Sequence, residues 1–147
     1  MGTNPDEVTF DLELTRRNFD HDEGLVREIG GIFIEDVPQL VEQLSRLRDQ
    51  LLSANTDEQG VAQGAIALRE AKRLAHSIKG LAATFGAEPL VSLAQEIEEE
   101  LACIPLEHSA AKIQRLAEIA VVTVGHLAVQ LQLVKQDDKA ASDPRRR

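Results

Sequence analysis

The chain has 147 residues with 16 basic and 25 acidic side chains, a formal net charge of −9, and this length predicts a single globular domain. The acidic total, together with four Phe and neither Tyr nor Trp, argues against a nucleic-acid-binding protein. No run reaches the roughly 18 to 20 apolar residues that a membrane span requires, and the first residues do not resemble a secretion signal. The lone cysteine, Cys103, cannot form an intrachain disulfide, so we expect a cytoplasmic protein without a membrane or nucleic-acid partner.

Apolar residues recur at spacings of three and four along most of the chain, which predicts an all-α fold. The first predicted helix follows a cap at Asp20 or Asp22. Pro38 either kinks this helix or starts a second one that continues to about residue 51. We expect a loop over residues 53–64, because that segment contains several turn-forming residues and two glycines.

The most regular apolar pattern predicts a third helix over residues 66–85. Gly86 and Pro89 then mark a short link to a fourth helix that ends before Pro105, and a fifth helix is expected over residues 109–134. These helices would pack most simply as an antiparallel four-helix bundle over residues 9–134, with the first helix as an additional N-terminal cover. Residues 1–8 and 135–147 lack the apolar spacing and are expected to be flexible ends.

The last predicted helix carries a second apolar stripe of Val122, Val129 and Leu133. We expect this stripe to pack under the covering helix, although it could also support a dimer or a docking surface. A monomer is the simpler expectation.

His76 lies on the predicted third helix about 200° from the apolar position Ile78, so its side chain is expected to face solvent. Cations cluster around it in an otherwise acidic chain, with Glu70 as the one acid among them: Arg69, Lys72, Arg73 and Lys79. An exposed histidine among charged residues is in most proteins an ordinary surface residue. Gly80 is less ordinary, because a glycine inside a helix costs about 1 kcal/mol relative to alanine. An imidazole nucleophile, cations that neutralise an anion and a cleared approach together suit phosphoryl transfer between proteins.

Residues 75–87, AHSIKGLAATFGA, resemble the signature of the histidine-containing phosphotransfer (HPt) domain family, in which HxxKG is followed by a second glycine. Residues 90–99 (LVSLAQEIEE) are similar to the next helix of that family, and residues 32–44 (IFIEDVPQLVEQL) to a segment near its start. The resemblance covers about residues 15 to 130.

This resemblance implies a role for each matching residue. His76 would be the phosphorylated residue, Lys79 would neutralise the phosphoryl oxygens, and Gly80 would let a partner approach. Glu98 falls where the family often places a Gln or Glu that faces the histidine, and Gln95 or Glu99 could occupy the same space. The partner-binding surface would comprise Arg69, Lys72, Arg73 and Ala83.

The resemblance also implies a phosphorelay intermediate, which accepts a phosphoryl group from a receiver-domain aspartate and passes it to another response-regulator receiver. Its expected partners are receiver domains and a hybrid sensor kinase. The sequence contains no GxxxxGK[ST] motif or kinase-like nucleotide motif, so we expect a phosphocarrier without ATP-dependent kinase activity. We expect no cofactor or metal on this chain, since Mg²⁺ would belong to the receiver. The alternative is a helical-bundle adaptor that binds a receiver or kinase without phosphotransfer.

Overall fold

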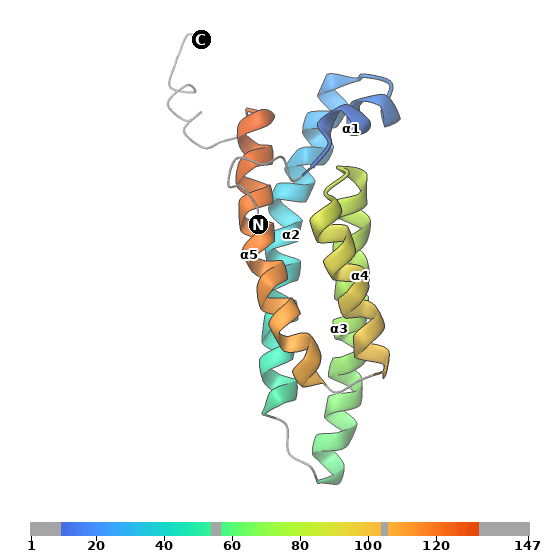
Figure 1. Ribbon diagram of the computed structural model, residues 1–147, viewed down its shortest axis with the longest axis vertical. Helices are drawn as coiled ribbons and strands as arrows, with labels where there is room; N and C mark the ends of the chain where they lie inside the picture. Colours follow the sequence, from blue (N-terminus) through green and yellow to red (C-terminus); the bar gives the residue numbers. More distant parts are fainter. Residues whose placement is uncertain (1–9, 54–56, 104–105, 133–147) are drawn as a thin grey trace.

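A computed structural model describes residues 10–53, 57–103 and 106–132, and within these ranges it contains helices and no strand. The long helices run side by side along the molecule, with a short helix across one end (Figure 1). The all-α bundle predicted from the sequence is therefore confirmed. The helices are α1 (Leu12–Asn18), α2 (Glu23–Leu52), α3 (Glu58–Thr84), α4 (Glu88–Cys103) and α5 (Leu106–Gln130). No helix in these ranges is long and apolar enough to cross a membrane.

Helix α2 is one continuous helix, where the sequence left open a break at Pro38. The carboxylate of Asp22 caps its start and accepts a hydrogen bond from the backbone N–H of Leu25 at 3.1 Å. Pro38 lies inside the helix and removes one backbone hydrogen bond. Buried residues continue on both sides of it, among them Phe33 and Leu44. Packing along the whole apolar face thus outweighs the lost bond.

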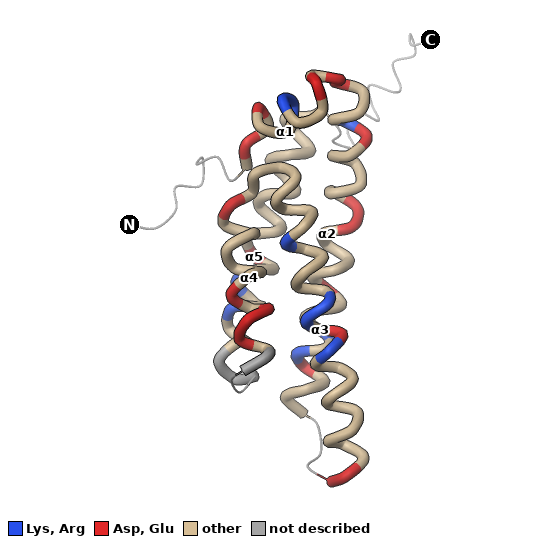
Figure 2. The backbone as a smooth tube through the Cα atoms, turned by 90° about the vertical axis from the view of Figure 1, so that its right-hand side faces the viewer, with Lys and Arg blue, Asp and Glu red and all other residues tan. Residues whose placement is uncertain are grey.

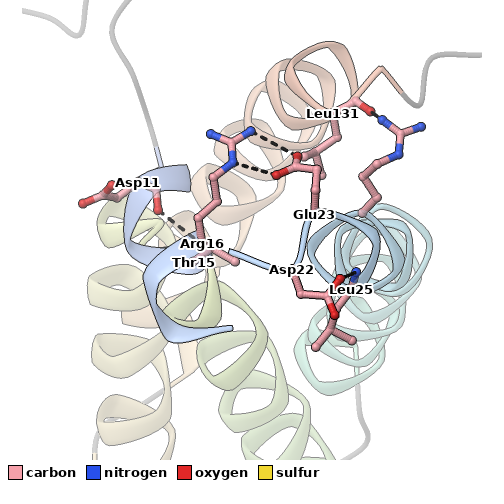
Figure 3. A network of polar contacts seen from close by, with 8 residues as sticks. Asp11, Thr15, Arg16, Asp22, Glu23, Leu25 and Leu131 are labelled. Atoms are coloured by element: carbon pink, nitrogen blue, oxygen red, sulfur yellow. Dashed lines mark hydrogen bonds and ion pairs between the residues drawn. The ribbon is translucent and has the colours of Figure 1, made fainter. Parts of the chain in front are cut away.

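The covering helix is α1, and its residues lie before those that the sequence assigned to this role. Its start is tied to the end of α3: the N–H of Asp11 donates to the carbonyl of Phe85 at 2.8 Å, and the buried Thr15 hydroxyl donates to the carbonyl of Thr84 at 2.9 Å. Arg16 forms an ion pair with Glu23 of α2 at 3.0 Å (Figure 3). Seven residues are too few for an apolar period to show, so this helix was not recognisable from spacing.

Helix α3 begins two turns earlier than predicted, and most of the loop expected over residues 53–64 is helical. Asp57 caps the helix by accepting a hydrogen bond from the N–H of Gly60 at 2.8 Å. The two glycines that suggested a loop lie inside the helix. Gly60 is buried, and a Cβ on Gly64 would lie at an ordinary contact distance, 3.8 Å, from Leu51 of α2, so neither glycine interrupts the helix.

The core lies between α2, α3, α4 and α5, where the rings of Phe33 and Phe85 meet edge to face with centroids 5.3 Å apart. On α5, however, Val122 and Val129 are exposed, with relative exposures of 44% and 61%. The expectation that they pack under a covering helix is wrong, because α1 is held at the end of α3. Leu133 and the predicted flexible ends, residues 1–8 and 135–147, lie outside the described residues.

Candidate functional site

His76 lies in the middle of α3, and its side chain is 67% exposed. The neighbouring Ala75 and Ile78 are fully buried in the core. Because successive residues of a helix turn by about 100°, burying these two residues directs position 76 outward. The imidazole is thus presented to solvent by a rigid element.

Glu98 of α4 joins His76 to Lys79. Its Oε2 lies 3.0 Å from Nδ1 of His76, and its Oε1 accepts a hydrogen bond from Nζ of Lys79 at 2.9 Å. The two helices meet here because the chain reverses at Gly86, whose φ of +58° is the left-handed conformation that glycine adopts readily. The structure therefore places Glu98 where the resemblance expected a partner for the imidazole.

The charge on Glu98 determines which nitrogen of His76 carries a hydrogen. The hydrogen bond from Lys79 has the largest effect on the pKa of the Glu98 carboxyl and lowers it; burial opposes this with a smaller effect, and the hydrogen bond from His76 lowers the pKa further. The carboxylate is therefore ionised at neutral pH and can only accept hydrogen bonds. In the neutral imidazole Nδ1 must then be the donor, which leaves the lone pair on Nε2.

Gln95 and Glu99, the alternatives considered for the place beside His76, have different partners. The amide oxygen of Gln95 accepts a second hydrogen bond from Nζ of Lys79 at 2.9 Å, and the amide nitrogen of Gln95 donates to Glu99. Sequence reasoning missed the contact between Gln95 and Lys79. The available signal was that Gln95 precedes Glu98 by one turn and therefore shares its face of α4.

Gly80 is exposed one turn beyond His76 on α3, and a Cβ placed there would meet no atom within 4 Å. Close packing within the protein therefore does not require this glycine. Ala83, one turn further along, is also exposed. Because neither residue has a side chain larger than a methyl group, the surface of α3 beside the imidazole carries no bulky side chain at these two positions.

Lys and Arg residues gather along the middle of α3 (Figure 2), but their environments differ. Arg73 is paired with Glu70, with Nε and Oε1 3.1 Å apart, so its charge is largely compensated. Arg69 is exposed and Lys72 is half-buried, and neither forms an ion pair with another described residue. The expected basic strip is thus present on one helix, although two of its four cations, Arg73 and Lys79, have acidic partners.

The other histidines whose side chains are described lie on other elements than the site. His21 lies in the turn between α1 and α2, His126 lies on α5, and the side chain of His108 is outside the described residues. The described part of the chain contains no group of three or more His, Cys, Asp or Glu residues suited to a metal ion.

A comparison with known protein families indicates which kind of domain has this arrangement. The family model of the Hpt domain matches residues 28–137, a range that begins in α2 and includes the whole of α3, α4 and α5. This chain belongs to the Hpt domain family. Hpt domains act in histidine phosphotransfer in two-component signalling, where they interact with receiver domains and kinases and have no kinase activity of their own. No curated protein and no solved structure gave a significant match.

The range matched by the family model includes α3, the helix that carries His76. In this Hpt domain the HxxKG residues His76, Lys79 and Gly80 all lie within the matched range. Helix α1 lies before that range and covers one end of the bundle.

Proposed function

We propose that this Hpt domain is a cytoplasmic phosphorelay intermediate. His76 accepts a phosphoryl group from an aspartyl phosphate on one receiver domain and passes it to the aspartate of another. The observation that carries the proposal is an exposed imidazole whose Nδ1 faces an ionised carboxylate, with Lys79 bound to that same carboxylate.

The transfer step follows from the hydrogen-bond pattern. The Nε2 lone pair attacks phosphorus, the N–P bond forms, and the P–O bond to the receiver aspartate breaks, so that aspartate leaves as a carboxylate. The ring then carries a positive charge, which Glu98 stabilises through the N–H on Nδ1. No base has to remove a proton before the attack, because Nε2 of the neutral ring already holds a free lone pair.

The other residues of the site allow the receiver to approach His76 and provide positive charge. Lys79 neutralises phosphoryl oxygens during transfer, and Gly80 with Ala83 lets the receiver surface come close to His76. Arg69 and Lys72 add positive charge where an acidic receiver site would dock, and Arg73 lies beside them as a contact residue whose charge is largely compensated by Glu70. Mg²⁺ is held by the carboxylates of the receiver, and the Hpt domain docks as a monomer.

Incubation with a receiver that carries labelled aspartyl phosphate tests this function. We expect label on the Hpt domain that survives base and is lost in acid, as a phosphohistidine requires. The variant His76→Gln should take up no label, and His126→Gln on α5 should behave as the wild type. Tight receiver binding without transfer by the wild-type protein would contradict the proposal and indicate an adaptor.

A further inference from the structure

Lys79 is held from two sides by residues of α4. Its Nζ donates to Oε1 of Glu98 and to Oε1 of Gln95, each at 2.9 Å. The Lys79 side chain is only 24% exposed, whereas His76 beside it is 67% exposed. Lys79 is thus a fixed cation at the edge of the site, although lysine is a long and flexible side chain.

Two hydrogen bonds restrict the orientation of an ammonium group more than one hydrogen bond does. Nζ has three N–H donors arranged tetrahedrally. A single acceptor would leave the group free to rotate about that hydrogen bond. Two acceptors fix the direction of the third N–H, which neither Gln95 nor Glu98 uses. That third donor is the one available to a phosphoryl oxygen.

The neutral amide of Gln95 suits this position better than a second carboxylate would. Glu98 already supplies one negative charge to Lys79, and a second would leave less positive charge to attract a phosphoryl group. The amide nitrogen of Gln95 donates to Glu99, four residues along α4. This contact fixes the orientation of the amide, so that its oxygen faces Lys79.

We propose that Gln95 is a positioning residue for phosphotransfer, oriented by Glu99, which aims Lys79 at the phosphoryl group without neutralising it. The proposal rests on the function proposed above, because it concerns transfer to and from His76.

A double-mutant cycle measures this role. Transfer from a phosphorylated receiver is followed over a range of receiver concentrations for Gln95→Ala, Lys79→Ala and the double variant. We expect Gln95→Ala to lower the maximal rate about fivefold, the factor for one lost hydrogen bond, with an unchanged half-saturating concentration. In the Lys79→Ala background the same substitution should have no further effect, because the lysine that Gln95 positions is gone.

Two further variants separate positioning from a structural role. Gln95→Glu should slow transfer more than Gln95→Ala, because it adds a negative charge beside the phosphoryl group. Gln114 of α5 is a matched control: its amide also donates to an acid four residues later, Glu118, at 3.3 Å and also accepts from a cation, Arg48. Gln114→Ala should transfer at the wild-type rate.

The outcomes distinguish the two proposals. Failure of the wild-type protein to transfer would contradict the proposed function itself. Normal transfer by the wild type together with an unchanged Gln95→Ala rate would overturn only the role of Gln95. Independent, multiplying effects of Gln95→Ala and Lys79→Ala would also overturn it, as would a change confined to the half-saturating concentration.

Discussion

Glu98 is the side chain that connects the imidazole of His76 to the ammonium group of Lys79, and its ionisation keeps both in place. Its pKa is lowered in the folded protein by the hydrogen bonds from Lys79 and His76. A carboxyl group with a lowered folded pKa stabilises the fold at pH values above its unfolded pKa. That stabilisation is lost as the pH falls through the folded pKa.

The variant Glu98→Gln tests this linkage. At neutral pH we expect it to be less stable than the wild type by no more than about 1 kcal/mol, since the pair is partly exposed. The difference should be complete above the ordinary glutamate value of 4.5 and should shrink as the solution becomes more acidic. Thermal unfolding of both proteins across this pH range measures it. A stability difference that does not vary with pH would contradict the assignment.

The sequence predicted the residues within α3 better than those that meet them from α4. His76, Lys79 and Gly80 are within about one turn of each other, so helix geometry alone relates them. Glu98 followed from the family resemblance. The bond from Lys79 to Gln95 depends on how the antiparallel helix α4 is placed and on two side-chain conformations, which no spacing along the chain reveals.

Helix α3 combines a stable apolar face with a glycine that its own packing does not need. Since nothing lies within 4 Å of a Cβ at position 80, Gly80→Gln should stabilise the protein by up to about 1 kcal/mol. It should at the same time weaken receiver binding, because the new side chain occupies the approach to His76. Thermal unfolding and a receiver titration measure the two effects.

Gly125 provides the control for this substitution. It is also open on the exposed face of its helix, α5, so Gly125→Gln should give a similar gain in stability. Its receiver affinity should remain that of the wild type. Wild-type affinity of Gly80→Gln would contradict the role given to Gly80.

The ends of the helices were harder to predict from the sequence than the existence of the helices, and the reasons are physical. Proline and glycine usually interrupt helices, because proline removes a backbone hydrogen bond and glycine has no side chain. Pro38 and Gly60 nevertheless lie inside helices, since the apolar faces of these helices pack along their whole length. The packing of α2 against α3, and of α3 against α4, thus outweighs the low helix propensity of these residues. Helix α1 is stabilised by contacts to the end of α3 that spacing cannot indicate.

Across the whole molecule the net charge of −9 hides a local excess of positive charge on α3. Arg69 and Lys72 lie on this helix without an ion pair among the described residues, whereas Arg73 is paired with Glu70. An acidic receiver would therefore be attracted to one helix of a predominantly acidic protein.

The substitution Arg69→Glu tests this attraction. We expect it to slow receiver association about tenfold at low salt, with a difference from wild type that shrinks as salt increases. Arg115→Glu, at an exposed position of α5, makes the same change in net charge and should have a small effect. Stopped-flow association rates at two salt concentrations measure both. Equal slowing by the two variants would mean that net charge alone determines association.

The proposed phosphotransfer depends most on phosphorylation of His76 at Nε2, with Nδ1 held by Glu98. The direct measurement is nuclear magnetic resonance of the imidazole nitrogens in the protein phosphorylated by its receiver. We expect one phosphohistidine, at position 76, with phosphorus bonded to Nε2 and hydrogen on Nδ1. Phosphorus on Nδ1 of His76, or on any other residue, would contradict the proposed transfer.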